Sequence, residues 1–139
     1  MKQLLEELET LNLPKDEYAL WGSAPLVIRG IKVENHDLDI LVTKKLWNEL
    51  AKNHQVQLFQ NKTEQGKFIT IGRLDFIQHI IGFTETECEA MIKQADIING
   101  YFFVTLKDII KWKNILQREK DILDIKLIEQ YLQNEGDFT

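Results

Sequence analysis

Two aspartates separated by a single residue are the groups in this sequence best suited to binding a metal ion. Asp37 and Asp39 lie in an apolar run that ends at Val42. Side chains of a β-strand alternate between its faces, so an extended chain here points both carboxylates the same way. Two strand positions span roughly 6.5–7 Å, which lets both groups reach one cation. Because two unpaired carboxylates repel each other, and because hard oxygen ligands suit Mg²⁺, the pair predicts a magnesium site.

A Gly-Ser pair upstream has the properties of a phosphate-binding turn. Gly22 places no side chain in the path of an anion, and Ser23 adds a hydroxyl. Pro25 suits the first turn of a helix, where its missing N–H is no loss. The free N–H groups of a turn that leads into a helix bind phosphate well. The sequence therefore predicts a strand–turn–helix–strand unit that holds a phosphate-binding turn and a metal-binding strand.

The order and spacing of these residues resemble the signature of the DNA-polymerase-β-type nucleotidyltransferase superfamily. That signature is a hydrophobic residue, Gly, then Gly or Ser, a short spacer, and Asp–hydrophobic–Asp or Glu. Here Trp21 precedes the Gly-Ser pair, and thirteen residues separate Ser23 from Asp37. The family carries a third carboxylate on a neighbouring strand, and Asp75, within Leu-Asp-Phe, stands in the matching context.

The resemblance covers roughly residues 17–130 and implies both a fold and an activity. The implied fold is α/β (α+β), a small mixed β-sheet with helices packed on it, in one nucleotidyltransferase-like domain over residues 1–139. The implied reaction moves an NMP from an NTP such as ATP to a hydroxyl acceptor, with Mg²⁺, or Mn²⁺, as the cofactor.

The same resemblance implies roles for the residues of the motif. Asp37, Asp39 and Asp75 would be the catalytic metal ligands, because two metal ions about 3.5–4 Å apart neutralise the entering and leaving oxygens. Asp75 would also help to deprotonate the acceptor. Gly22 and Ser23 would hold the nucleotide's β- and γ-phosphates. Phosphoryl transfer requires little more than such positioning and charge stabilisation.

Three cations are lesser candidates for contacts with the nucleotide: Arg29, Lys44 and Lys113. Lys44 falls in the first turn of a helix that Thr43 is expected to cap, where it either reaches a phosphate or an acidic acceptor or is simply solvated. Lys113 falls on an otherwise apolar helix face that includes Leu106 and Ile109. It either extends to solvent or meets a carboxylate.

The run from Lys107 to Asp124 resembles the end of small bacterial members of the superfamily, such as the nucleotidyltransferase toxin of an abortive-infection system. Small members of this kind often act beside a helical partner protein. The alternative for Asp121 and Asp124 is structural, since both could cap the last helix and pair with Arg118 or Lys120. A transition-metal site at His36 and His79 has no matching ligand motif.

Composition limits the class of protein. A length of 139 residues predicts one domain, and a net charge of −5 gives no strong nucleic-acid signal. Cys88 is the only cysteine, so neither an intrachain disulfide nor a thiolate zinc cluster can form. The N-terminus reads as an amphipathic helix, and no apolar run is long enough to span a membrane. We expect a cytoplasmic protein.

Periodicity and turn residues predict the remaining elements. We expect the last helix to turn Ile122, Ile125, Ile128 and Leu132 inward. Helices are expected at 1–12, after Thr43, at 84–94, after Thr105 and at 121–132, strands at 18–21, 37–42, 56–59, 68–71 and 74–81, and an Asn-Gly hairpin at 97–104.

Two functions remain open at this point. The first is a Mg²⁺-dependent nucleotidyltransferase with an unidentified acceptor, which could be a small molecule, a protein or tRNA. The alternative is a catalytically inactive module of the same fold that binds a nucleotide or a partner, for example in a toxin–antitoxin system. The second function predicts a partner surface on an exposed apolar stripe such as Leu4, Leu8 and Leu11. A homodimer or a helical partner protein fits either function.

Overall fold

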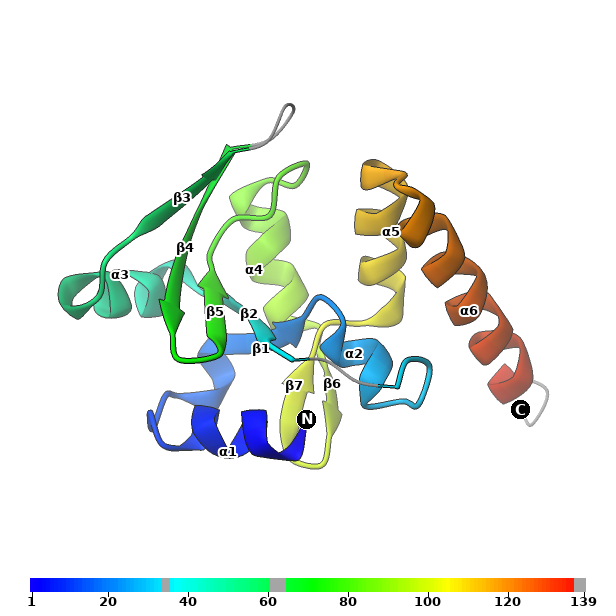
Figure 1. Ribbon diagram of the computed structural model, residues 1–139, viewed down its shortest axis with the longest axis horizontal. Helices are drawn as coiled ribbons and strands as arrows, with labels where there is room; N and C mark the ends of the chain where they lie inside the picture. Colours follow the sequence, from blue (N-terminus) through cyan, green and yellow to red (C-terminus); the bar gives the residue numbers. More distant parts are fainter. Residues whose placement is uncertain (34–35, 61–64, 137–139) are drawn as a thin grey trace.

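A computed structural model describes residues 1–33, 36–60 and 65–136 of the chain (Figure 1). The strands are β1 (Tyr18–Trp21), β2 (Leu38–Val42), β3 (Gln57–Gln60), β4 (Gln65–Ile71), β5 (Leu74–Ile77), β6 (Asp96–Ile98) and β7 (Tyr101–Phe103). The helices are α1 (Lys2–Glu9), the 3₁₀ turn η1 (Lys15–Glu17), α2 (Ala24–Val27), α3 (Lys44–Asn53), α4 (Glu85–Lys93), α5 (Leu106–Leu116) and α6 (Glu119–Gly136).

The strands form one mixed sheet in the order β3-β4-β5-β2-β1-β7-β6. The pairs β2–β5 and β1–β7 are parallel, and the other neighbours are antiparallel. A mixed sheet with helices packed on it confirms the expected α/β (α+β) class. Residues 34–35, which precede the predicted strand at 37–42, lie outside the described residues.

Local sequence signals account for several boundaries. The Thr43 hydroxyl accepts a hydrogen bond from the backbone N–H of the third residue of α3, and Thr105 does the same for α5. Thr84 and Glu87 form a reciprocal capping box at the start of α4. Asn99 and Gly100 both have positive φ, 52° and 83°, as the tight β6–β7 hairpin requires.

Helices cover both faces of the sheet and divide its core in two. One face packs against α1 and α3, and the other against α4 and α5, with α6 packed on α5. In Figure 1 the last two helices lie antiparallel to each other beside the sheet. Among the described residues, no helix is both long and apolar enough to cross a membrane. Fully buried side chains of the two halves include Leu8, Leu20, Ile40, Phe76 and Phe103 on the first face and Leu26, Leu41, Ile109 and Ile128 on the second.

The apolar stripe of α1 is a packing face. Leu4 and Leu8 are 2% and 1% exposed, and Leu11 packs against the same cluster. This agrees with the packing expected from helical spacing. A partner surface on Leu4 and Leu8 is therefore absent from this fold.

Strand β5 is shorter than predicted. It ends at Ile77, whereas an apolar run to Ile81 suggested four more strand residues. The backbone N–H of Ile80 instead donates to the buried Cys88 sulfur at 3.4 Å, and the Ile80 carbonyl accepts from Phe83. The apolar residues after β5 thus pack on α4 in a loop rather than extending the sheet.

The last helix also differs from prediction. Ile128 is fully buried as expected, but Ile122 and Leu132 are 50% and 44% exposed. The inward positions of the first turns belong instead to Asp121 and Asp124, which are 0% and 4% exposed. Apolar periodicity alone gave the wrong face because charged partners elsewhere in the chain make the burial of these carboxylates favourable.

Candidate functional site

The predicted site begins with a row of side chains across four neighbouring strands. Trp21 on β1 is paired with Asp39 on β2, Asp39 with Asp75 on β5, and Asp75 with Thr70 on β4. Paired residues of adjacent strands point to the same face and lie about 5 Å apart at their backbones. The structure therefore brings two of the three predicted carboxylates side by side.

Both carboxylates have identifiable neighbours. The Thr70 hydroxyl donates a hydrogen bond of 2.6 Å to Oδ1 of Asp75. In the described part of the chain, neither Asp39 nor Asp75 forms an ion pair with a lysine or arginine. The two adjacent negative groups are thus left without a neutralising side chain, which is the arrangement expected of cation ligands.

Asp37 lies immediately before this row rather than in the strand. Strand β2 begins at Leu38, whose N–H donates to the carbonyl of Arg73 in the β4–β5 turn at 3.0 Å. The exposed Asp37 is close enough for its charge to act on Asp39. The third predicted carboxylate is therefore adjacent to the pair, just before the amino end of the central strand β2.

The electrostatics of the row are most visible at Asp39. Burial raises the pKa of this carboxyl to about 6 from 3.8, and the negative charges of Asp75 and Asp37 add to the rise. At neutral pH this carboxyl is ionised, but its ionisation is less favourable in the native state than in the unfolded chain, and the difference lowers the stability of the fold. A bound cation would remove that loss of stability.

Gly22 closes the site on the β1 side. A Cβ built on this residue would lie 2.5 Å from Oδ2 of Asp39, and its φ of +70° is one that side-chain-bearing residues rarely adopt. The predicted turn therefore lies directly against the predicted metal ligand. Ser23, the next residue, is the N-cap of α2, but its hydroxyl makes no capping hydrogen bond. Among the described residues this hydroxyl has no hydrogen-bond partner, so a ligand could bind it.

The described side chains around Asp39 and Asp75 do not form a complete set of metal ligands. Within the described residues, no three His, Cys, Asp or Glu side chains gather closely enough to hold an ion. What fits a divalent cation is the chemistry of the donors: adjacent carboxylates, unneutralised by cations, one of them with a raised pKa.

Two of the three predicted cations lie in other surroundings. Arg29 donates to the carbonyl of Pro25 at 2.8 Å and to Asp96 at 2.7 Å, which ties α2 to β6. Lys44 follows the carboxyl end of β2, whereas Asp39 lies near its amino end. Its Nζ is 4.0 Å from Glu85. Contacts of either residue with a nucleotide stay a prediction.

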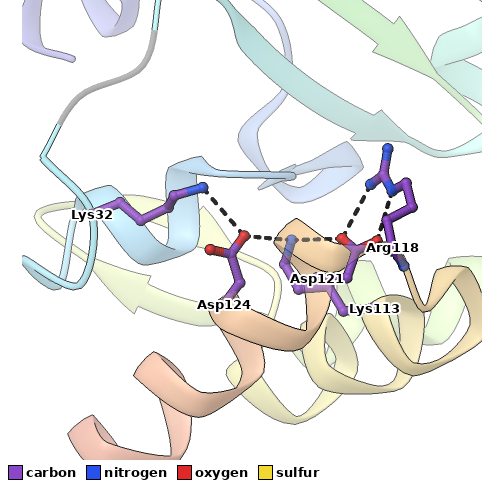
Figure 2. Close-up of polar contacts among 5 residues, drawn as sticks. All are labelled: Lys32, Lys113, Arg118, Asp121 and Asp124. Carbon is purple, nitrogen blue, oxygen red and sulfur yellow. Dashed lines mark hydrogen bonds and ion pairs between the residues drawn. The ribbon is translucent and has the colours of Figure 1, made fainter.

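Lys113, the third cation, belongs to a buried ionic cluster between α5 and α6 (Figure 2). Its Nζ lies 3.3 Å from Asp121 Oδ1 and 2.9 Å from Asp124 Oδ2. Lys32, from the loop after α2, reaches Asp124 at 3.2 Å, and the Nε of Arg118 reaches Asp121 at 2.6 Å. Of the two alternatives for Lys113, the structure has the one in which it meets carboxylates.

The cluster has a structural function that its geometry makes plain. Asp121 also accepts from the backbone N–H of Arg118 at 3.1 Å, so it caps the start of α6. Burial raises the pKa of the Asp121 carboxyl, but the hydrogen bonds from Arg118 and the charge of Lys113 outweigh it and leave that pKa below its usual value. The structural alternative for these aspartates thus describes Asp121 well. The cluster holds α5, α6 and the loop before β2 together.

An aromatic cavity beside the row of carboxylates was not predicted. The rings of Trp21 and Trp112 are 4.2 Å apart at their centroids. With Ile77, two residues beyond Asp75 on the same face, they line a cavity of about 200 Å³. Trp112 stands on α5, within the run from Lys107 to Asp124, but the resemblance of that run implied no role for it. Only its aromatic character could have indicated a role.

Comparison with known proteins adds no family. No protein-family model, curated protein or solved structure matches the chain. A resemblance to nucleotidyltransferases therefore stays a prediction from the sequence motif.

Proposed function

We propose that this protein is a Mg²⁺-dependent nucleotidyltransferase that moves an NMP from an NTP to a hydroxyl acceptor. One observation carries the proposal: Asp39 and Asp75, 36 positions apart in the sequence, are register partners on one sheet face, with Gly22 in contact with Asp39. The motif predicted this convergence. The register supports the proposal because two aspartates with no shared function need not be strand partners.

The reaction requires few protein groups. The acceptor's hydroxyl oxygen attacks the α-phosphorus, the bond to pyrophosphate breaks, and pyrophosphate leaves with the electron pair. The hydroxyl proton passes to a carboxylate, for which Asp75 is our candidate. Ser23 and the backbone at Gly22 would bind the leaving phosphates. All of these groups lie at one end of β1, β2 and β5.

Asp37, Asp39 and Asp75 would hold Mg²⁺, or Mn²⁺. When bound, the metal supplies neutralisation of the charge on the entering and leaving oxygens. The raised pKa of Asp39 supports this assignment because a cation would favour its ionised form. Trp21 and Trp112 offer an aromatic surface near these carboxylates for stacking of the nucleobase. ATP is the first donor to test, and the supply of NTP and Mg²⁺ in the cytoplasm makes that the proposed location.

The acceptor and any partner protein remain open in this proposal. The inactive-module alternative keeps less support, because the surface that it predicted is buried at Leu4 and Leu8. A second copy of the chain or a helical partner that completes the acceptor site stays compatible with the proposed activity.

The first experiment is thermal unfolding with ATP, GTP, CTP and UTP, each with Mg²⁺ and with EDTA. A ligand at about 100 times its dissociation constant adds about 2.7 kcal/mol of stability, several degrees for a domain of this size. We expect a Mg²⁺-dependent shift with at least one NTP that is lost in Asp39→Asn. The matched control is Asp16→Asn, at an exposed position of η1.

Each variant is compared with its own metal-free melting temperature, so a change in its intrinsic stability does not affect the result. Transfer is then measured with the same NTP carrying a labelled α-phosphate. A shift that persists in Asp39→Asn, or no shift with any of the four nucleotides, would count against the proposal.

A further inference from the structure

The carboxyl ends of the parallel strands β2 and β5, opposite to the end that holds Asp39 and Asp75, are arranged as in known ligand sites. The chain leaves β2 into α3, which packs on one face of the sheet through Leu46 and Leu50. It leaves the adjacent strand β5 towards α4, which packs on the other face through Met91 and Ile92. In open α/β sheets, connections that diverge from neighbouring parallel strands leave a crevice at their carboxyl ends, where ligands bind.

A cavity of about 450 Å³ occupies this crevice, a volume typical of small-molecule sites. Its wall comes from the start of α3, the start of β4, the loop after β5 and the start of α4. Asp39 and Asp75 do not line it, because they lie near the amino ends of the same strands. The cavity therefore lies away from the proposed metal ligands, although it adjoins the aromatic cavity of Trp21 and Trp112, with which it shares His79 and Ile81.

The charge of the cavity is opposite in sign to that of the protein. Lys44 and Lys67 reach it from different elements, and among the described residues that line it the one acidic side chain is Glu85, 4.0 Å from the Lys44 ammonium. The whole chain carries a net charge of −5. A pair of ammonium groups in a concave site on an acidic protein favours an anionic ligand.

The remaining lining groups indicate what the anion carries. Trp47, half-buried and one helical turn after Lys44, offers an aromatic face. Asn48 and Gln78 bring amide groups that both donate and accept, and neither side chain has a hydrogen bond within the described ranges. A flat heteroaromatic ring can stack on the indole and engage the amides at its edge.

We propose that this cavity binds a phosphate monoester that carries a flat heteroaromatic ring, with a nucleoside monophosphate as the simplest representative. The two lysines contact the phosphate, and Trp47 stacks on the ring. This binding needs neither Mg²⁺ nor the three aspartates, so the proposal stands or falls independently of the proposed transfer reaction.

The test is calorimetric titration of the protein in EDTA with AMP, GMP, CMP and UMP. We expect saturable binding of at least one of them at about one molecule per chain. Adenosine and ribose 5-phosphate separate the two halves of the ligand. These two compounds are compared with AMP if AMP binds. Adenosine lacks the phosphate and ribose 5-phosphate lacks the ring. If either of them binds as tightly as AMP, the missing group contributes nothing and the proposed ligand class is wrong.

Three variants and a control locate the site. Lys67→Gln and Trp47→Leu should each weaken binding about tenfold, which corresponds to about 1.4 kcal/mol. Lys45→Gln removes the same charge one residue from Lys44, outside the cavity lining, and should leave the affinity unchanged. Asp39→Asn should also bind normally.

Three results would overturn the proposal. They are no binding of any of the four monophosphates up to about 1 mM, equal weakening by Lys45→Gln and Lys67→Gln, and loss of binding in Asp39→Asn. The last would place the ligand at the carboxylate site instead. Lys67→Gln, at an exposed position, keeps the test decisive if Trp47→Leu lowers the melting temperature.

Discussion

Replacing Asp39 with Asn should make the metal-free protein more stable at neutral pH. The native state holds the proton of this carboxyl more tightly than the unfolded chain does, because burial and the charges of Asp75 and Asp37 raise its pKa. As the pH rises from about 4 to about 6, the wild type therefore loses stability that the uncharged Asn variant keeps. Asn has nearly the same shape, so it fits against Gly22 as Asp39 does.

The structure also gives a magnitude. A rise of the pKa from 3.8 to about 6 corresponds to about 3 kcal/mol above pH 7. Partial contact of Asp39 with solvent screens the charges, so we expect Asp39→Asn to raise the free energy of unfolding by about 1–3 kcal/mol. For a domain of this length, the melting temperature would rise by roughly 3–10 °C.

Thermal unfolding in EDTA at pH 7.5 and pH 4.5 measures this effect. The advantage of Asp39→Asn should fall to about a third of its size at pH 4.5, where the wild-type carboxyl is mostly protonated in the native state. Asp16→Asn, at an exposed position, should stay within about 0.5 kcal/mol of the wild type. A variant less stable than the wild type at pH 7.5, or an equal gain at both pH values, would refute the electrostatic account.

Two other substitutions test the packing around the site. Gly22→Ala should abolish nucleotide binding and lower the free energy of unfolding by at least about 1–3 kcal/mol, because its Cβ would lie 2.5 Å from Asp39 Oδ2. Gly30→Ala is the control, since it has a similar φ of +76° but nothing near its Cβ, so only backbone strain remains. Urea unfolding measures both losses. Lys113→Met should lower the free energy of unfolding by about 3–5 kcal/mol, because it leaves buried carboxylates without their shared cation. Lys32→Gln, at the exposed end of the same cluster, should lower it by about 1 kcal/mol or less. Equal losses in the two variants would contradict the burial assigned to Lys113.

Local chemistry made part of this fold predictable. The caps at Thr43 and Thr105 and the hairpin at Asn99 and Gly100 depend on hydrogen bonds and φ values within a few residues. The Gly-Ser turn could be predicted for the same reason, since glycine adopts a positive φ such as that of Gly22 without strain.

Long-range pairing was beyond such reasoning. Nothing near Asp75 specifies that β5 pairs in parallel with β2 in a register that aligns it with Asp39. The resemblance to the superfamily implied a neighbouring strand for Asp75, but neither the direction of that strand nor its register. The buried face of α6 depends likewise on Lys113 and Lys32, which precede it in the chain and make burial of Asp121 and Asp124 favourable. Apolar periodicity ignores such partners, and it therefore selected Ile122.

The pKa values of Asp39 and Asp121 are shifted in opposite directions, so one pH experiment can separate the proposed site from the cluster between α5 and α6. Asp121 has a lowered pKa in the native state, so its contribution to stability is present at neutral pH and is lost as the pH falls below about 4. Asp39 acts in the opposite direction between about 4 and 6. In EDTA, Arg118→Gln should reduce only the stability that the protein loses below about pH 4. Asp39→Asn should abolish only the loss of stability between about pH 4 and 6. Saturating Mg²⁺ should restore stability at pH 7.5 in the wild type but not in Asp39→Asn, because only the ionised carboxylate binds the ion. If Arg118→Gln altered the decline above pH 4, the two groups would be coupled, and the cluster between α5 and α6 would have to be assigned to the site.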